Sequence, residues 1–264
     1  MNVLPSLYIP HGGGPCFFMD DPAATWTGMA TYLEGLAASL PEPPKAILVV
    51  SAHWETDGFA FTGAAEPDLI YDYSGFPPHT YALRYPAAGA PELAARCAEL
   101  LADAGITSSI DPERGLDHGV FIPLMVAFPD VEIPVVEMSI DRSFDPTLHM
   151  AAGAALAPLR AEGVLVIGSG MSFHNMGAYG DPRAMVPSQA FDRWLAETAA
   201  LPAPLRSTRL ENWDQAPAGR YAHPHGAEEH LLPLMVAAAA SPEPGRRTYS
   251  EVVLGTAISA FRFD

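Results

Sequence analysis

The sequence predicts an α/β fold, a single domain in which helices flank a central, mostly parallel or mixed sheet. Short apolar runs typical of buried strands alternate along the chain with amphipathic helical patterns, the order expected for a parallel sheet covered on both faces. The chain has 264 residues, 49% of them hydrophobic and 17% charged, which suffices for one large core. No internal repeat or low-complexity linker divides it, so we expect one domain over residues 1–264.

Each strand is predicted from an uninterrupted or alternating apolar run, and each helix from apolar residues at helical spacing. The predicted strands cover 4–9, 46–53, 57–62, 131–139, 163–168 and 248–256. The predicted helices cover 22–39, 90–104, 119–127, 146–159, 187–200 and 228–240. Two further stretches, 64–89 and 201–227, are rich in Pro, Gly and aromatic residues and are expected to be irregular. Loops of such length inside a compact domain usually have a function.

Composition excludes several classes of partner. The formal net charge is −17, from 14 Lys and Arg against 31 Asp and Glu, and no basic run occurs, which excludes a nucleic-acid partner. No segment approaches the ~20 apolar residues of a membrane span, and no signal peptide is predicted. The two cysteines, Cys16 and Cys97, form neither a metal motif nor a disulfide framework, so a cytoplasmic location is expected.

Three histidines follow predicted buried strands. His11 comes after Leu4–Pro10, His53 after the run 46–50, and His174 after Val164–Ile167 and a Gly-Ser-Gly turn. Ligands of open α/β sheets bind at the carboxyl ends of the strands, and neutral imidazole is the commonest metal ligand. The sequence therefore predicts a metal site at the C-terminal edge of the strands. A lone histidine at a strand end is more often structural, so the prediction depends on several meeting there.

Two more histidines open predicted helices. Asp117 is a plausible N-cap, which places His118 in a first turn, where the helix dipole disfavours protonation and suits a neutral base. His230 begins the last helix with Glu229 beside it, the usual partner of a ligating imidazole. Three others have no comparable context and are predicted on the surface or in loops: His79, His149 and His223.

Covalent and protease-like chemistry is disfavoured by the spacing of the candidate residues. No Gly-x-Ser-x-Gly elbow occurs, and Ser169 lacks an assignable base. Cys16 lies near His11, but nothing indicates a lowered thiol pKa. His225 and His230 are separated by four residues, whereas the His-Glu-x-x-His motif of zinc proteases places its histidines at i and i+4.

Taken in order, the motifs resemble the class III extradiol ring-cleavage dioxygenases, in the branch that includes DOPA 4,5-dioxygenase. Each motif alone is weak, whereas the ordered set is specific and covers almost the whole chain. The motifs are His11-Gly-Gly-Gly-Pro, Ser51-Ala-His-Trp, Gly75-Phe-Pro-Pro, Leu83-Arg-Tyr-Pro, Gly115-Leu-Asp-His-Gly, Gly168-Ser-Gly with His174-Asn, Glu229-His-Leu-Leu-Pro-Leu and the Phe261-Arg-Phe tail.

The resemblance implies a mononuclear non-haem Fe(II) site, in which zinc is often found in related purified proteins. By position it implies that His11, His53 and His230 are the metal ligands, and that His118 and His174 are catalytic acid/base groups. Two alternatives remain: His174 as a fourth zinc ligand, and Glu229 in place of His230, because some relatives have a glutamate as third ligand.

The implied reaction is extradiol cleavage of a small aromatic diol by O2, catalysed by one domain that covers residues 1–264. A zinc-dependent hydrolase and a non-catalytic metal-binding protein are the alternatives. Arg84 is a candidate partner for a substrate carboxylate, and the candidate aromatic walls are Trp54, Tyr73, Phe76, Tyr81 and Tyr221. The catechol, the regiochemistry and the native metal stay open. So does the oligomeric state, for which a homodimer is the commonest choice.

Overall fold

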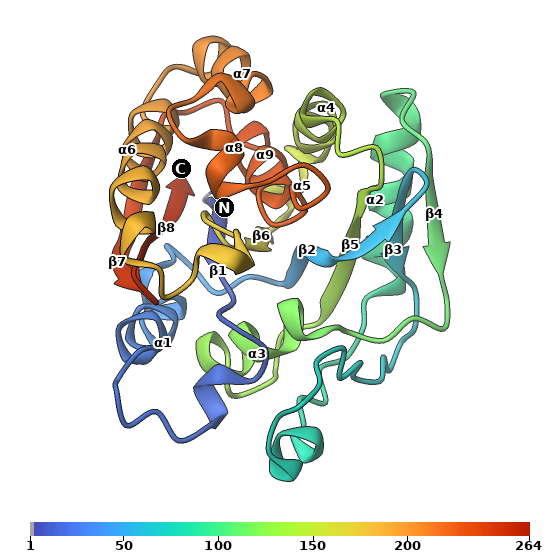
Figure 1. Ribbon diagram of the computed structural model, residues 1–264. Helices are drawn as coiled ribbons and strands as arrows, with labels where there is room; N and C mark the ends of the chain where they lie inside the picture. Colours follow the sequence, from blue (N-terminus) through green and yellow to red (C-terminus); the bar gives the residue numbers. More distant parts are fainter. Residues whose placement is uncertain (1–2) are drawn as a thin grey trace.

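The computed structural model describes residues 3–264 and contains one eight-stranded sheet in the order β4-β3-β5-β2-β6-β1-β8-β7 (Figure 1). The four central strands, β5, β2, β6 and β1, are parallel to one another. Antiparallel pairs join β3 to β5 on one side and β8 to β1 on the other. The sheet is therefore mixed, with a parallel centre, and the predicted single-domain α/β fold is confirmed.

The strands alternate with helices along most of the chain. The strands are β1 Ser6–Pro10, β2 Ala46–Thr56, β3 Phe59–Thr62, β4 Ser108–Asp111, β5 Val135–Asp141, β6 Val164–Gly170, β7 Gly245–Val253 and β8 Thr256–Phe263. The α-helices are α1 Thr27–Glu34, α2 Pro91–Asp103, α3 His118–Ala127, α4 Pro146–Leu156, α5 Leu159–Glu162, α6 Met185–Ala199, α7 Ala203–Glu211, α8 Gly219–Ala222 and α9 Leu232–Ala239.

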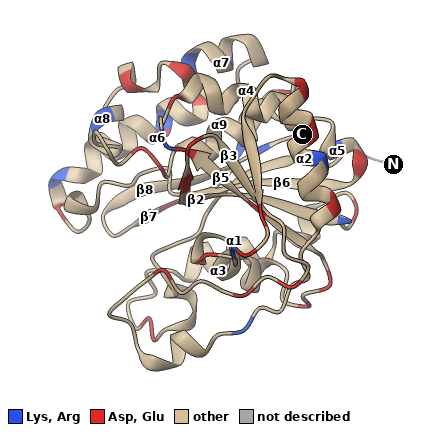
Figure 2. Ribbon diagram, turned by 90° about the vertical axis from the view of Figure 1, so that its right-hand side faces the viewer, with Lys and Arg blue, Asp and Glu red and all other residues tan. Residues whose placement is uncertain are grey.

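Helices cover both faces of the sheet, with α1 and α3 on one side and α2, α4, α6 and α9 on the other (Figure 2). The central strands β1, β5 and β6 are buried at every position, as continuous apolar runs predict for a sheet with two covered faces. The edge strand β7 instead exposes charged and polar side chains, which keeps its free edge from pairing with another chain. Acidic residues lie mainly on the outer helices and loops (Figure 2).

Several sequence-based boundaries were wrong. The single strand predicted at 248–256 is a hairpin of β7 and β8, turning at Leu254 and Gly255, both with positive φ. The short strand β4 was not predicted, since its four residues are polar or small apart from Ile110. The stretch 201–227 is largely helical, containing α7 and α8. Residues 64–89 are irregular as predicted, apart from a 3-10 helix over Pro78–Ala82.

Helix α9 approaches the sheet closely because glycines face it. A Cβ on Gly168 or Gly170 of β6 would lie 2.2 Å from the Pro233 carbonyl oxygen or 2.1 Å from that of His230, respectively. The Tyr8 hydroxyl donates a hydrogen bond of 2.7 Å to the same His230 oxygen. These contacts fix the chain at the start of α9 against the carboxyl ends of β1 and β6.

Among residues 3–264, no helix is both long and apolar enough to cross a membrane.

Candidate metal centre and its acid/base histidines

Strand register brings the predicted histidines to one edge of the sheet. Pro10 at the end of β1 pairs with Gly170 at the end of β6, and Ser51 of β2 pairs with Ser169. His11 directly follows β1. His53 lies within β2, which continues to Thr56 rather than ending at 53, just beyond the last pairing of β2 with β6. Both imidazoles therefore lie at the carboxyl ends of the parallel strands, where an α/β sheet binds ligands.

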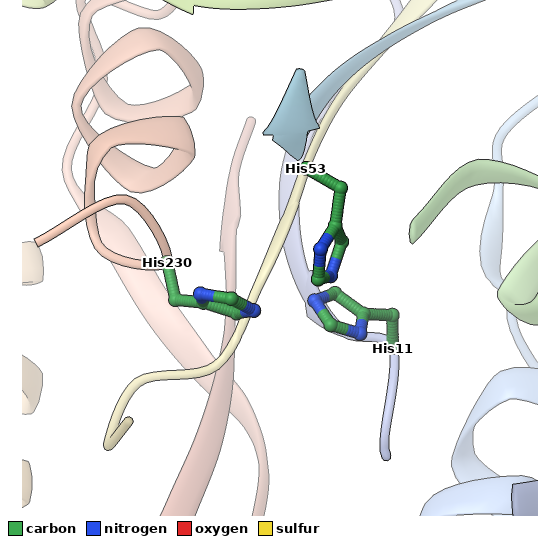
Figure 3. A group of neighbouring side chains, drawn as sticks. All are labelled: His11, His53 and His230. Carbon is green, nitrogen blue, oxygen red and sulfur yellow. The ribbon is translucent and has the colours of Figure 1, made fainter. Parts of the chain in front are cut away.

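His230 completes a group of three imidazoles. It lies in the turn just before α9, which begins at Leu232 rather than at 228 as predicted. The ring centroids are 4.9 Å apart for His11 and His53, 5.1 Å for His11 and His230, and 4.9 Å for His53 and His230. One nitrogen of each lies within 4.8 Å of the others, and the rings converge on a common point (Figure 3).

Burial keeps these three imidazoles neutral. His11 is 1% exposed and His230 is 3% exposed. Burial, reinforced by the neighbouring histidines, lowers the pKa of both well below the ordinary value, and burial with His118 lowers the pKa of His53 to about 4. Neutral imidazole is the form that binds metals.

Several nitrogens of this group have no partner in the protein. Both ring nitrogens of His11 and Nε2 of His53 are buried without a hydrogen bond. His230 directs Nδ1 to Glu229 Oε1 at 2.8 Å, which leaves Nε2 for another ligand. Buried polar atoms are almost always paired, so orphaned nitrogens on converging rings fit a bound cation.

Two carboxylates flank the three-histidine group. The Asp72 carboxylate lies between His118 and His53, and Glu229 lies between His174 and His230, giving two further sets of potential ligand atoms. In both sets, however, the carboxylate already contacts imidazole Nδ1 atoms: Asp72 that of His118 at 2.8 Å, and Glu229 that of His230. The three-histidine group differs in that both nitrogens of His11 and Nε2 of His53 are buried without a hydrogen-bond partner.

His174 lies against the ligand-like His230. Their rings are stacked, with centroids 3.4 Å apart and planes at 20°. His174 Nδ1 is 3.0 Å from Glu229 Oε1 but is not aligned for a hydrogen bond to it. The next residue, Asn175, donates to the Tyr221 carbonyl oxygen at 2.8 Å. The Glu229 carboxylate is thus a close polar neighbour of His174 as well as the hydrogen-bond partner of His230.

His118 is the first residue of α3, as predicted, and is 6% exposed. Asp117 occupies the N-cap position, but its carboxylate does not cap the helix. It accepts hydrogen bonds from Ser51 Oγ at 2.7 Å and from Arg114 at 3.1 Å, while its backbone N–H donates to Glu137. The bond between Ser51 and Asp117 ties β2 to the start of α3, next to His53 and His118.

A buried ion network supports that junction. Glu137 is fully buried, and burial together with the nearby Asp117 raises its pKa well above the usual range. Arg114 lies 3.3 Å from Glu137 and 3.1 Å from Asp117, and its guanidinium stacks on Trp54 at 4.4 Å. Trp54, predicted as a substrate wall, is 6% exposed and forms part of this support.

Some of the residues predicted to contact the substrate lie near the histidines and others do not. The Tyr73 ring meets that of His118 edge-on at 5.7 Å and packs with Phe76 at 5.5 Å and Tyr81 at 5.3 Å. Tyr221 packs against Phe173 at 6.1 Å. Arg84 is exposed and lines a surface cavity with residues 66–69 and 85–88, a lining that includes none of the site histidines.

The histidines predicted on the surface divide. His79 is exposed, as expected. His149 and His223 are both fully buried: the prediction was wrong for His149, which lies inside α4, whereas His223 lies in the loop after α8. His149 bonds to the backbone of Asp145 and Asp141, which closes the turn before α4, and His223 packs between aromatic rings. Asp72 was missed, because it lies in an irregular stretch; its only signal was a charge between two tyrosines.

Known proteins match the chain over nearly its full length. A family model for the catalytic LigB subunit of aromatic ring-opening dioxygenase matches residues 7–261. The chain is 40% identical to the 4,5-DOPA dioxygenase extradiol of Beta vulgaris, covering 92% of this chain and 88% of that protein. It is 37% identical to dioxygenase tasH of Hapsidospora irregularis, with 99% and 86% covered.

An Escherichia coli K12 protein also named 4,5-DOPA dioxygenase extradiol is 35% identical, with 88% of this chain and 83% of that protein covered. The crystal structure of uncharacterized protein JW3007 from Escherichia coli K12 superposes with a TM-score of 0.79 at 29% identity, covering 99% of this chain and 100% of that one. The chain therefore belongs to the catalytic LigB subunit family of aromatic ring-opening dioxygenases, and its predicted assignment to the extradiol ring-cleavage dioxygenases is confirmed.

Proposed function

We propose that the protein is an Fe(II)-dependent dioxygenase that opens the ring of a catechol-type substrate next to its two hydroxyl-bearing carbons. The observation that carries the proposal is the convergence of three neutral imidazoles in which both nitrogens of His11 and Nε2 of His53 are buried without a protein partner. Two further histidines, each beside a carboxylate, flank them. Family membership supports ring opening by O2, while the metal and the substrate are part of the proposal.

His11, His53 and His230 would hold the metal. Three imidazoles leave room for exogenous ligands, and imidazole suits iron as well as zinc, so the donor set alone does not choose the metal. When bound, iron would lower the pKa of the catechol hydroxyls and pass electrons between the aromatic ring and O2, a redox step that zinc cannot perform. Glu229 would orient His230 by accepting a hydrogen bond from its Nδ1–H, as carboxylates beside ligating histidines commonly do.

His118 and His174 would move the protons. His118 Nδ1 is bonded to Asp72, so Nε2 is the atom that can accept a proton from the catechol. His174 is more accessible, with 17% of its side chain exposed, and can exchange protons with solvent. Its close stacking on His230 does not by itself assign it a role but supports the proposal that it transfers protons beside the ligand set or, alternatively, is a fourth ligand to zinc.

The substrate is proposed to be a flat aromatic diol. Tyr73, with Phe76 and Tyr81 packed around it, presents an aromatic surface next to His118, and flat rings pack well on such surfaces. Relatives named 4,5-DOPA dioxygenases make DOPA the first catechol to test. Arg84 remains a candidate partner for a substrate carboxylate, although the cavity that it lines includes none of the site histidines.

The decisive experiment is oxygen uptake by anaerobically Fe(II)-reconstituted protein given a panel of catechols, with zinc-loaded protein as the control. Uptake with iron alone, with a coloured ring-opened product, supports the proposal. Uptake with neither metal contradicts it. Oxygen-independent turnover of an ester or amide by the zinc form would favour the zinc-dependent hydrolase, and metal binding without turnover the non-catalytic metal-binding protein.

A histidine variant tests the ligand assignment. His11→Ala should lose metal binding and ring cleavage together, because it removes the most buried member of the group. His225→Ala is the matched control, since that side chain is 83% exposed. Retained Fe(II) binding and activity in His11→Ala would contradict the assignment.

We also infer a cytoplasmic location, since neither cysteine is in a disulfide. A homodimer stays the expected assembly, and sedimentation would test it.

A further inference from the structure

The irregular segment 64–89 is attached to the chain just before α3 by backbone hydrogen bonds. Leu116 N donates to the Asp68 carbonyl oxygen and Ile70 N to that of Leu116, both at 2.8 Å, in a parallel bridge that pairs Leu69 with Leu116. Asp72 follows Leu69 by three residues, and His118 follows Leu116 by two. The backbone pairing therefore sets the carboxylate alongside the imidazole.

A glycine makes this attachment possible. A Cβ on Gly115 would lie 2.3 Å from the Asp68 carbonyl oxygen, closer than any side chain tolerates. Because Gly115 has no side chain, the segment that carries Asp72 can approach the chain just before α3.

Asp72 contacts His118, a proposed proton-transfer group, and lies near His53, a proposed metal ligand. Its Oδ1 accepts hydrogen bonds from His118 Nδ1 at 2.8 Å and from the His118 backbone N–H at 3.0 Å. Its Oδ2 is 3.8 Å from His53 Nδ1, an ion-pair distance too long for a hydrogen bond. The Asp72 side chain is 23% exposed, so these contacts are only partly screened by water.

We propose that Asp72 is a positioning residue that fixes His118 as the Nδ1-protonated tautomer and holds it against the ligand histidine His53. The role rests on the proposed function, in which His118 transfers a proton and His53 binds the metal. A carboxylate that accepts from Nδ1 leaves Nε2 as the basic atom and holds the ring in one orientation.

Asp72 is not assigned as a metal ligand. Its Oδ1 is already bonded twice to His118, and its Oδ2 faces the Nδ1 side of His53, whereas the unpartnered nitrogen of His53 is Nε2. A ligand role predicts that removing the carboxylate lowers the metal content. A positioning role predicts that the metal content stays and proton transfer slows.

The first test compares Asp72→Ala and Asp72→Asn with the parent and with Glu66→Ala, an exposed carboxylate of the same segment. Asp72→Ala should lower kcat by about 10- to 100-fold while KM for the catechol changes by less than about threefold, the loss typical of outer-shell partners. Asp72→Asn should lose less, because its amide oxygen can still accept from His118. Bound metal per chain should equal that of the parent in all variants.

Loss of metal from Asp72→Ala would overturn the proposal in favour of a ligand role. Unchanged kcat in Asp72→Ala, or an equal effect of Glu66→Ala, would overturn it as well.

The second test needs no turnover. Long-range ¹H–¹⁵N NMR of metal-free, ¹⁵N-histidine-labelled protein should show His118 in the Nδ1-protonated form, with the signal assigned by its loss in His118→Gln. Asp72→Ala should convert that signal to a mixture of tautomers, and Glu66→Ala should not. An Nε2-protonated His118 in the parent would overturn the proposal. Because this reading is independent of O2, absent ring cleavage would contradict the proposed function and leave this result standing.

Discussion

The close approach of α9 to β6 predicts that a single added methyl group can displace His230, the proposed metal ligand. In Gly170→Ala, the new Cβ would lie 2.1 Å from the His230 carbonyl oxygen, whereas ordinary contact begins at 3.4 Å. The His230 backbone must therefore retreat by about 1 Å, while metal–ligand distances tolerate only about 0.2 Å. The movement also strains the hydrogen bond from the Tyr8 hydroxyl to that oxygen.

Two effects should follow in Gly170→Ala. Overpacking should lower the free energy of unfolding by about 1–3 kcal/mol. Metal affinity should fall by about 100-fold or more, because His230 itself is displaced. Loss of a group that only orients a ligand already lowers the affinity by about 10- to 100-fold. Urea unfolding followed by circular dichroism measures the first effect, and calorimetric titration of zinc into the metal-free protein measures the second.

Gly153→Ala is the matched control. Its Cβ would lie 2.3 Å from the Val236 carbonyl oxygen, a clash of the same size against the same helix α9 but six residues beyond His230. Both variants should lose similar stability, and only Gly170→Ala should lose metal affinity disproportionately. Equal metal affinities in the two variants would refute the reasoning, as would a Gly170→Ala protein that binds zinc as tightly as the parent.

Other predictions follow from burial and charge. Burial lowers the pKa of His223 from 6.5 to about 4, so below pH 6.5 the unfolded chain binds a proton that the folded chain does not. The folded protein should therefore lose up to about 3 kcal/mol of stability through this residue as the pH falls from 6.5 to 4. His223→Gln should abolish that part of the loss, as measured by urea unfolding across pH. Arg114→Ala should cost about 3–5 kcal/mol by leaving two buried carboxylates uncompensated, whereas Arg142→Ala, at an exposed pair, should cost under about 1 kcal/mol. Glu229→Gln should weaken zinc binding about 10- to 100-fold in the same titration. Zinc at a concentration about 100 times its dissociation constant should raise the free energy of unfolding by about 2.7 kcal/mol. A chelator should reverse this increase, and His11→Ala should not show it.

The alternation of apolar runs and helical patterns determined the fold class and most central elements. Runs such as 46–50 and 164–167 are apolar throughout because both faces of the sheet are covered, so they predict strands without help from tertiary contacts. The edges were harder. Strand β4 has little apolar signal of its own, and the β7–β8 turn depends on positive φ at Leu254 as well as Gly255.

The same limit appears in the helices and the buried histidines. Helix α7 has few apolar residues, and it becomes ordered by packing its buried residues, Arg206 and Leu210, against the domain. The burial of His149 depends on hydrogen bonds to backbone atoms that are brought near it by the turn before α4. Neither feature leaves a local pattern in the sequence.

For the site, the sequence by itself determined which histidines follow strands or open helices, and hence that His11, His53, His118, His174 and His230 are candidates. Only the tertiary structure shows which of them converge, because strand register brings His11 and His53 together and the close approach of α9 to β6 sets His230 beside them. Asp72 belongs wholly to the tertiary structure. It lies beside His118, 46 residues away in sequence, because a backbone bridge pairs Leu69 with Leu116, and no local periodicity encodes such a pairing.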